Sequence, residues 1–589
     1  MCGIIGITGN NVQNIDASNI PLMLASLSKR GPDDHGTLAF PSCLLGQTRL
    51  SIVDLSGGHQ PMKDAKRDMA ITFNGEIYNY RELKKDLEAK GYVFSTHSDT
   101  EVILKMYQEH GEGCLHYLDG MFAFAIWDNE KKLLFMARDR FGKKPFYYAF
   151  DQDNNLIFAS EIKAIFASGK IQGIIDPQAI DNYLALMYIP PHKTVYKNIF
   201  TLAPAECATY HNGTLTKKKY WELSYAPINI SYDDAKEKVR QLLTASVKKR
   251  MVADVEIGSF LSGGVDSTLV TLLAQSFSKT PIKTFSVGYQ NYINELPFAL
   301  EASKRIGTDH YPLQAKNDMT ENLRVVMACF DEPHADSSDF PQYLVSKLAA
   351  SKVKVALSGD GADELFMGYG WYTRHRHLSY RAHFFEKLLL DPFQGYVRNI
   401  SIWSARERKR LWGKNSKYVN EFLSPEIAGS KLPPIAKINL FDLTTYLPGQ
   451  LLTKADRMGM MNSLEVRSPF LDHHLTEFAF NLPQEDWKTG KKILKDLLQE
   501  IMPLEFVNRK KQGFGAPVKM WLKEPAFKDL VHKTLLAPEA EVFQYLDKKE
   551  IGKIIEKFYG EKKDSYYYKI WVLLCLELWL DSHKQYHTN

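Results

Sequence analysis

The chain has 589 residues, too many for one hydrophobic core, so two or more domains are expected. Its 74 Lys and Arg residues nearly balance 69 Asp and Glu residues, and no basic run contains interleaved aromatics, which argues against a nucleic-acid-binding surface. The six cysteines show no paired spacing, which argues against a disulfide framework or zinc site and favours a reducing, cytoplasmic location. No secretory leader is visible, and the longest apolar run, 570–580, is about half a membrane span, which predicts a buried helix and no membrane insertion.

The N-terminus places a thiol next to the initiator methionine. Loss of Met1 would make Cys2 the first residue, with a nucleophile and an α-amine on one residue. An α-amine titrates near ~8 and can serve as the base that activates such a nucleophile. The alternative is that Cys2 is an accident of translation start, and the motifs further along the chain argue against it.

Residues 1 to about 200 contain short β-type runs, many with period-two alternation, separated by Gly, Asp and Asn turns. Helical patterns are few, and the clearest span 82–90 and 101–110. Residues 202–222 predict a hairpin-like connector with an Asn212-Gly213 turn. This region is predicted to be α+β, with layered sheets and helices outside. The predicted strands are 3–8, 44–53, 69–73, 121–127, 133–138 and 156–159.

From about residue 230 strands alternate with helices, which predicts a parallel sheet that binds ligands at the carboxyl ends of its strands. Beyond about residue 370 the pattern is mostly helical. We predict a first domain over 1–215, a linker over 216–230 and an α/β domain over 231–589. The predicted elements are helix 232–249, strand 255–261, helix 267–277, strand 284–289, helix 296–306 and strand 353–357.

Several motifs accompany Cys2, namely 30–33 (RGPD), 47–53 (QTRLSIV), 73–79 (FNGEIYN), 97–101 (HSDTE) and 139–142 (DRFG). Their order and spacing resemble the class II glutamine amidotransferase domain, an N-terminal nucleophile (Ntn) hydrolase fold, over about 200 residues. The resemblance implies that Cys2 is the nucleophile and that the Asn74 side chain and Gly75 N–H stabilise the oxyanion. It also implies a glutamine-binding set of Arg49 for the carboxylate, Glu76 and Asp99 for the ammonium, and backbone contacts from Leu50 and Val53.

Each of these residues has a simpler interpretation when taken alone. Arg49 could form a surface ion pair, Asn74-Gly75 could be a plain turn, and Asp99 could cap the helix that contains Glu101. The joint occurrence of the motifs favours the active-site interpretation.

A second motif, residues 260–267 (FLSGGVDS), follows an apolar strand and opens a helix. It lacks the lysine of a Walker loop. Backbone N–H groups from Ser262 through Gly263 and Gly264 to Ser267, at a helix N-terminus, suit a pyrophosphate anion, and Asp266 offers a hard oxygen to Mg²⁺. The loop resembles the pyrophosphate loop of enzymes that split ATP between the α and β phosphates, although a Gly-Gly turn alone is often only a connection.

A third motif, residues 358–364 (SGDGADE), also follows a strand. Both loops together resemble the ATP-pyrophosphatase-type synthetase domain of glutamine-hydrolysing asparagine synthetases, and this resemblance continues through 331–333, 454–457 and 465–472 to about residue 520. It implies ATP contacts from Leu261, Val287, Ser358 and Gly359, Mg²⁺ ligands Asp266 and Asp363, and phosphate neutralisation by Lys491, which could instead be a solvated helix lysine. Asp360 stands where several family members carry Glu, at a position tied to acyl-adenylate formation.

The resemblance implies one enzyme with two sites, which makes ammonia from glutamine and passes it internally to an acyl-AMP formed from ATP and aspartate. It also allows a homodimer. The alternatives are another carboxylate acceptor, such as a sugar acid of a surface glycan or a peptide precursor, and a regulatory protein that retains both folds. Intact Cys2, Asp266 and Asp363 argue against the regulatory protein. Asp339, within 335–341, replaces an expected small residue, and it either alters the acceptor pocket or caps a helix.

Overall fold

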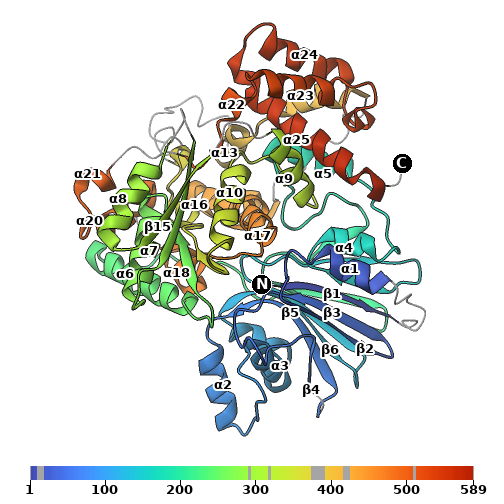
Figure 1. Ribbon diagram of the computed structural model, residues 1–589, viewed down its shortest axis with the longest axis vertical. Coiled ribbons are helices and arrows are strands. Elements are labelled where there is room, and N and C mark those ends of the chain that lie inside the picture. The colour runs from blue at the N-terminus through green and yellow to red at the C-terminus, as the bar shows by residue number, and fades with distance from the viewer. Residues whose placement is uncertain are drawn as a thin grey trace.

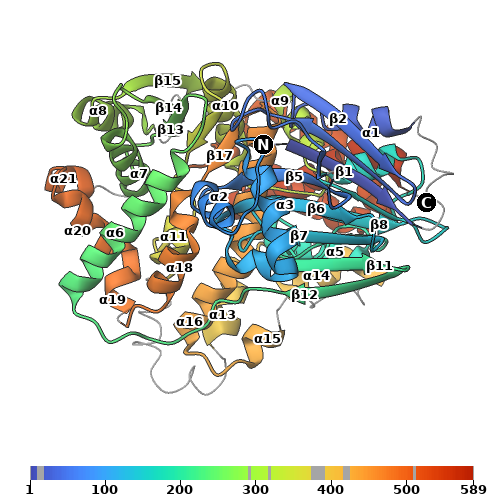
Figure 2. The ribbon, with the colours of Figure 1, turned by 90° about the horizontal axis from the view of Figure 1, so that it is seen from below.

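The computed structural model describes residues 2–9, 19–64, 66–289, 294–315, 320–372, 392–414, 425–483, 485–508 and 513–587. Two facing antiparallel sheets form the N-terminal part of the chain, up to Lys219, which we call the first half. A parallel sheet with many helices forms the part from Tyr232 onward, which we call the second half (Figure 1). Seen from below, the two kinds of sheet lie side by side with the N-terminus between them (Figure 2). The N-terminal strand therefore lies where the two halves meet.

The first sheet has the order β10-β8-β9-β1-β3-β2 and the second has the order β12-β11-β7-β6-β5-β4. All their pairings are antiparallel; β1, for example, pairs Cys2 with Arg49 of β3. The strands are β1 (Cys2–Thr8), β2 (Asp34–Phe40), β3 (Cys43–Arg49), β4 (Met62–Asp64), β5 (Met69–Ile77), β6 (Gly120–Asp128), β7 (Leu133–Arg138), β8 (Tyr147–Phe150), β9 (Leu156–Ala159), β10 (Ile199–Thr201), β11 (Glu206–His211) and β12 (Thr214–Lys219).

Alternating side chains of the two sheets interdigitate in a dry layer that includes Ile4, Leu45, Trp127 and Phe158. Helices cover the outer faces of both sheets, so the layered α+β prediction is confirmed. These helices are α1 (Ile20–Ser26), α2 (Tyr80–Ala89), α3 (Asp99–His110), η3 (Gly111–His116), α4 (Ile162–Ala167) and α5 (Pro177–Leu186).

The second half is built on a parallel sheet of order β15-β14-β13-β16-β17, as predicted. Helices α6 and α7 pack on one face, whereas α10 and α17 pack on the other. The strands are β13 (Ile257–Phe260), β14 (Lys283–Tyr289), β15 (Asp309–Ala315), β16 (Val355–Leu357) and β17 (Glu465–Arg467), and the flanking helices are α6 (Tyr232–Arg250), α7 (Val265–Ser276), α8 (Leu296–Ile306), α9 (Thr320–Cys329), α10 (Asp339–Ala350), α11 (Ala362–Leu365) and α17 (Thr453–Met460).

The remaining regular elements of the described chain are helices. Before α17 these elements are α13 (Pro392–Ile400), α14 (Ala405–Trp412), α15 (Pro425–Gly429), α16 (Pro434–Phe441) and the π-helix η5 (Asp442–Leu452). After β17 they are η6 (Pro469–Leu471), α18 (His473–Phe480), α19 (Glu485–Lys488), η7 (Thr489–Lys491), α20 (Lys492–Gln499), α21 (Leu504–Val507), α22 (Val518–Trp521), α23 (Pro525–Leu535), η8 (Glu541–Gln544), α24 (Lys548–Tyr559), η9 (Asp564–Tyr566), α25 (Tyr567–His583) and η10 (Lys584–Tyr586).

The predicted buried C-terminal helix is α25, in which residues 570–580 are all buried. Its one carboxylate within that run, Glu577, accepts the backbone N–H groups of Glu541 (3.0 Å) and Val542 (2.7 Å), which satisfies the buried oxygens. All six cysteines are free, as expected. Among the described residues no helix is both long and apolar enough to cross a membrane.

The predicted strand 44–53 ends at Arg49, because residues 50–58 form the loop that holds the Arg49 side chain. The Asn212-Gly213 hairpin is confirmed, with both turn residues at positive φ (50° and 77°). Strand β12 continues to Lys219, and residues 220–231 form neither helix nor strand. The domain boundaries themselves stay a prediction.

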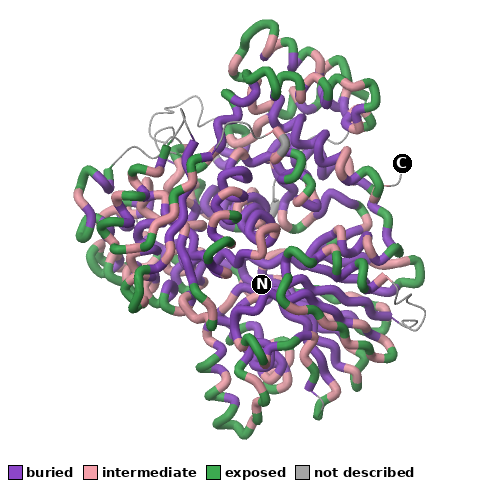
Figure 3. Tube along the Cα trace, in the orientation of Figure 1, coloured by how far each residue is buried: buried purple, intermediate pink, exposed green. Residues whose placement is uncertain are grey.

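A buried ion network joins the two halves. Arg30, from the first half, contacts Glu161 (2.9 Å) and makes a bidentate pair with Asp456 of α17 (2.7 and 3.0 Å), and Lys144 lies 3.4 Å from the same carboxylate. Arg457, the next residue of α17, contacts Glu161 at 2.7 Å. Buried residues accordingly run through both halves where they meet (Figure 3).

We expect Asp456→Asn to destabilise the protein by about 3–5 kcal/mol, because it leaves the buried Arg30 guanidinium short of negative charge. Differential scanning calorimetry should show a lowered transition temperature. The control is Asp529→Asn, which removes an exposed pair with Lys533 and should cost below about 1 kcal/mol. An unchanged transition for the Asp456 variant would show that the network does not hold the halves together.

Candidate functional site

A pocket of about 300 Å³ opens where β1 begins and where β3 and β5 end. The structure brings seven of the predicted residues together in its lining, namely Cys2, Arg49, Leu50, Val53, Gly75, Glu76 and Asp99. Asn74 joins them through its hydrogen bond to Cys2. The lining also contains six residues that the sequence interpretation missed, namely Ile52, Gly58, Gln60, Phe73, Ser98 and Thr100.

Cys2 is 6% exposed, and its backbone nitrogen donates to Asn74 Oδ1 at 3.0 Å. Burial raises the pKa of the Cys2 thiol, and the Leu50 backbone and the Arg49 charge offset this only in part. The thiol is therefore protonated at neutral pH and needs a base to become a nucleophile. The prediction that the mature chain starts at Cys2 concerns Met1, which lies outside the described residues.

Asn74 and Gly75 lie in β5, next to Cys2. Because Asn74 Oδ1 accepts from Cys2, its Nδ2 points elsewhere, and this buried nitrogen has no hydrogen-bond partner among the described residues. A Cβ on Gly75 would lie 2.1 Å from the Met121 carbonyl oxygen, so only glycine fits here. The plain-turn interpretation is wrong, since both residues lie inside a strand.

Arg49 is 5% exposed and donates to three carbonyl oxygens of the following loop, those of Val53 (3.1 Å), Asp54 (2.7 Å) and Leu55 (3.3 Å). Among the described residues it forms no ion pair, so the surface-pair interpretation is wrong. The loop fixes a buried guanidinium that pairs with no carboxylate in the described part of the chain, which suits an anionic ligand.

Two carboxylates also line this pocket. Asp99 Oδ2 accepts the Ile77 N–H at 2.9 Å, and burial raises the pKa of Asp99 to about 6. Burial also raises the pKa of Glu76 well above its ordinary value. The helix cap is Ser98, whose Oγ accepts from Thr100, so the interpretation of Asp99 as the cap is wrong.

The second predicted site lies at the carboxyl ends of β13 and β16. Gly263 has a φ of 71°, and a Cβ there would lie 2.6 Å from the Phe298 backbone, so the turn requires glycine. Ser262 Oγ and Ser267 Oγ lie 3.0 Å apart across the loop. Gly359 packs against Asp266, since a Cβ on it would lie 3.0 Å from the Asp266 Cβ. Leu261 and Val287 are buried beside the loop, so the structure brings both glycine loops together.

Lys491 lies between the two predicted metal ligands. Its ammonium contacts the carboxylates of Asp266 and Asp363, the latter at 2.9 Å. Although burial disfavours its charge, these carboxylates hold the pKa of Lys491 above the ordinary value. Lys491 is 5% exposed with a φ of 62°, so the interpretation as a solvated helix lysine is wrong.

A third group of polar residues lies beside the second loop. Ser358 Oγ donates to Asp360 at 2.8 Å, and burial raises the pKa of Asp360. Lys454 of α17 donates to Ser338 (2.6 Å) and Asp336 (3.3 Å), and its charge acts on Asp360. The motif at 454–457 pointed to this lysine, but only the fold places it beside Asp360.

Arg467 of β17 contacts both sites. Its Nη2 lies 3.5 Å from Glu76 Oε1, and its carbonyl oxygen accepts the Ser358 N–H at 2.8 Å. Its Nη1 donates to the carbonyl oxygens of Arg250 and Val252, which fixes the side chain. One fully buried residue thus connects the Cys2 pocket to the second glycine loop.

Asp339 is the first residue of α10 rather than its cap, which is Ser338, so the cap interpretation is wrong. It is fully buried, and its Oδ2 lies 2.9 Å from His334 Nδ1. The imidazole therefore gives a hydrogen-bond partner to the buried carboxylate that stands in place of an expected small residue.

Comparison with known proteins gives matches over nearly the whole chain. A family profile described as asparagine synthase matches residues 238–581, and one described as a glutamine amidotransferase domain matches residues 1–221. Asparagine synthetase [glutamine-hydrolyzing] 1 of Bacillus subtilis is 34% identical, with 98% of this chain and 96% of the relative covered. Asparagine synthetase [glutamine-hydrolyzing] 3 of the same organism is 32% identical, with 94% and 93% covered. The putative asparagine synthetase [glutamine-hydrolyzing] 2 of Methanocaldococcus jannaschii is 40% identical, with 66% and 78% covered.

Proposed function

This chain belongs to the asparagine synthase family of glutamine-hydrolysing ligases, and on that premise we propose that it converts aspartate to asparagine through a β-aspartyl-AMP intermediate. Ammonia from glutamine would attack this acyl-AMP and release AMP, with pyrophosphate already formed. The observation that carries the proposal is Arg467, which touches Glu76 of one site and Ser358 of the other. Our proposal keeps the predicted division into 1–215, 216–230 and 231–589, and the homodimer that the resemblance allows.

We assign the Cys2 pocket to glutamine hydrolysis. The α-amine of a mature Cys2, held by Asn74 Oδ1, would take the thiol proton, and the sulfur would attack the glutamine amide carbon. Asn74 Nδ2 and the Gly75 N–H would stabilise the oxyanion that forms. Asn74 Nδ2 has no hydrogen-bond partner within the described ranges, which supports this role, because a buried donor without an acceptor is costly unless it serves a ligand.

The remaining pocket residues would orient glutamine. Arg49, whose charge has no ion-pair partner among the described residues, would bind the α-carboxylate. Asp99 and Glu76 would bind the α-ammonium, and Leu50 and Val53 would line the substrate. Collapse of the tetrahedral intermediate would release ammonia, which must stay unprotonated to act as a nucleophile, and an internal passage would serve this need.

We expect the KM for glutamine to rise as the pH falls through about 6, because Asp99 then gains a proton and loses the charge that binds the ammonium. One pH unit below this pKa about nine-tenths of Asp99 is neutral, so the KM should rise about tenfold at pH 5. Glutamate formation measured between pH 5 and 8 checks this, with Asp99→Asn as the control that removes the dependence. A KM that stays flat over this range would contradict the role of Asp99.

We assign the two glycine loops to ATP. The 262–267 N–H groups would bind the pyrophosphate, Leu261 and Val287 the adenine and ribose, and Ser358 and Gly359 the nucleotide. Asp266 and Asp363 fit Mg²⁺, since two carboxylates converge on one cation, Lys491, and Mg²⁺ commonly takes one or two carboxylates plus phosphate oxygens. Bound Mg²⁺ would neutralise the charge that develops on the pyrophosphate, and Lys491 would then contact the phosphates.

We assign the binding of aspartate, the carboxylate that accepts ammonia, to the polar residues beside the second glycine loop. Lys454 would bind the α-carboxylate of aspartate and Asp336 its ammonium, while Asp360 would support acyl-adenylate formation. Asp360 accepts from Ser358, which fixes its position in spite of a side chain one methylene shorter than Glu. These contacts support an amino-acid acceptor over an uncharged one, because a site built for two charges rejects ligands that lack them.

The test is pyrophosphate release with ATP, Mg²⁺ and ammonia in the presence of single candidate acceptors. We expect release with aspartate, no release with succinate, which lacks the α-ammonium, and no release with a uronic acid or a peptide carboxylate. Release with one of the last two and none with aspartate would leave only the amidotransferase class and favour the alternative acceptors. No release with any acceptor, together with no glutaminase activity, would favour a regulatory protein.

A further inference from the structure

The C-terminal helix α25 packs against the loop that carries part of the proposed aspartate site. This loop, residues 330–338, connects α9 to α10. It contains Asp336 and Ser338, whose side chains accept hydrogen bonds from Lys454 at 3.3 and 2.6 Å. The position of this loop therefore decides where Asp336 lies relative to Lys454.

Two indole N–H groups of α25 hold the loop at separate points. Trp579 donates to the Phe330 carbonyl oxygen and Trp571 donates to the Ala335 carbonyl oxygen, each at 3.1 Å. Both tryptophans are fully buried, and so are Phe330 and Ala335. Removal of either N–H would thus take a partner from a carbonyl oxygen that lies away from water, which is costly.

The hydrogen bond from Trp571 bears directly on Asp336. The Ala335 carbonyl belongs to the same planar peptide group as the Asp336 nitrogen, so a fixed oxygen also fixes the direction in which the chain enters Asp336. The Ala335 N–H is held as well, by the Met187 carbonyl oxygen at 3.0 Å. On the other side, the Ser338 N–H donates to Asp336 Oδ1 at 2.9 Å. Trp571 therefore acts on the peptide group that directs the Asp336 carboxylate.

Asp336 is suited to bind an ammonium group. Although burial disfavours its charge, Lys454 holds the pKa of Asp336 below its ordinary value, so the carboxylate is charged at neutral pH. Hydrogen bonds between charged groups weaken as the distance grows and the alignment worsens. A small displacement of this carboxylate would therefore weaken its hold on the α-ammonium of aspartate.

We propose that Trp571 is a positioning residue for aspartate, because its indole N–H fixes the peptide group before Asp336 and so sets where the ammonium-binding carboxylate lies. This inference rests on the proposed role of Asp336. It gives α25 a part in the synthesis, although no residue of α25 lines the Cys2 pocket.

The test is ammonia-dependent pyrophosphate release by Trp571→Phe at varied aspartate concentrations. Phenylalanine keeps a ring for the contact with Phe340, whose ring centroid lies 5.8 Å from that of Trp571, but it cannot donate a hydrogen bond. We expect the KM for aspartate to rise about tenfold. The kcat at saturating aspartate, the KM for ATP and the rate of glutamine hydrolysis should each change by less than about twofold, because the variant disturbs only the hold on the ammonium.

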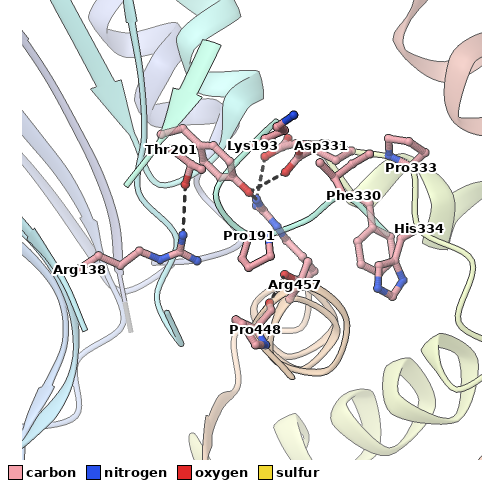
Figure 4. Close-up of a pocket in the computed structure, with 15 residues that line it drawn as sticks. Arg138, Pro191, Lys193, Thr201, Phe330, Asp331, Pro333, His334, Pro448 and Arg457 are labelled. Carbon is pink, nitrogen blue, oxygen red and sulfur yellow. Dashed lines mark hydrogen bonds and ion pairs between the residues drawn. The ribbon is translucent and has the colours of Figure 1, made fainter. Parts of the chain in front are cut away.

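Trp579→Phe is the matched control, since it makes the same replacement in the same helix and removes a hydrogen bond of the same length. The carbonyl oxygen that it releases precedes Asp331, which pairs with Arg457 at 2.9 Å and has no role in the proposed aspartate site (Figure 4). Its KM for aspartate should stay within about twofold of that of the unchanged protein. An equal rise in both variants, or no rise in Trp571→Phe, would overturn the role of Trp571.

A second replacement serves if Trp571→Phe does not fold. The tryptophan analogue 3-benzothienylalanine at position 571 keeps nearly the size of the indole and carries sulfur in place of the N–H. It should raise the KM for aspartate as phenylalanine does. A KM equal to that of the unchanged protein would show that the N–H does not position Asp336.

Hydrogen–deuterium exchange separates this inference from the proposed acceptor. If the unchanged protein releases no pyrophosphate with aspartate, the acceptor assignment fails, but amide exchange still shows whether Trp571 holds the loop. We expect the Ala335 and Ser338 amides to exchange at least about tenfold faster in Trp571→Phe than in the unchanged protein or in Trp579→Phe. Equal exchange in all three proteins would overturn the inference.

Discussion

Replacement of Cys2 by alanine is expected to abolish glutamine-dependent synthesis and to leave ammonia-dependent synthesis intact. The thiol is the nucleophile of the proposed glutaminase, and its loss should lower that rate by about 10³-fold or more. The glycine loops belong to a different sheet, so ammonia-dependent pyrophosphate release should change by less than about twofold. Paired assays with glutamine and with ammonium chloride measure both rates.

Cys43→Ala is the matched control, because Cys43 is a buried cysteine on the neighbouring strand β3 and should tolerate the change with both activities retained. Intact-mass spectrometry of the unchanged protein should show that Met1 has been removed. A fully active protein that keeps Met1, or a Cys2→Ala protein that still uses glutamine, would contradict the N-terminal nucleophile.

Replacement of Asp266 by asparagine is expected to remove ATP cleavage while glutamine hydrolysis persists. In the structure Asp266 and Asp363 share the Lys491 ammonium, and we propose that Mg²⁺ and pyrophosphate use the same carboxylates. Losing one of the two weakens the stabilisation of charge on the leaving pyrophosphate, which typically costs ~10²-fold or more in rate. Pyrophosphate and AMP formation from labelled ATP measures the effect.

Asp309→Asn is the control, since Asp309 is an exposed aspartate at the amino end of β15 in the same sheet, away from the nucleotide edge. It should keep the full rate. If the unchanged protein instead gives ADP and phosphate, the interpretation of residues 262–267 as a pyrophosphate loop is wrong.

The fold class followed from local patterns, because apolar runs such as 133–138 and the strand before Ser262 can be recognised within a few residues. The short strands β10 and β17 were not predicted, since they contain three residues each and show no periodicity. Position 339 shows a second limit. The sequence shows that residue 339 is an aspartate. It does not show that this aspartate pairs with His334, because that contact depends on how the loop before α10 folds.

The individual site motifs were also readable, because nucleophile, anion-binding and phosphate-binding chemistry restrict the residue types. What the sequence could not give was the contacts between motifs. Arg30 and Asp456 lie 426 positions apart, and Arg467 meets Glu76 only because β17 joins the parallel sheet at the edge facing the first half. Such pairings depend on tertiary packing and have no local signature.

The most direct test of the whole account uses aspartate labelled with ¹⁸O in its β-carboxylate, together with ATP, Mg²⁺ and glutamine. If the carboxylate attacks the α-phosphorus and ammonia then displaces AMP, one labelled oxygen must pass to AMP while asparagine, glutamate and pyrophosphate form. The account predicts ¹⁸O in AMP in amounts equal to the asparagine made. Asparagine formed with unlabelled AMP, or no asparagine with ATP still cleaved in response to another carboxylate, would contradict it.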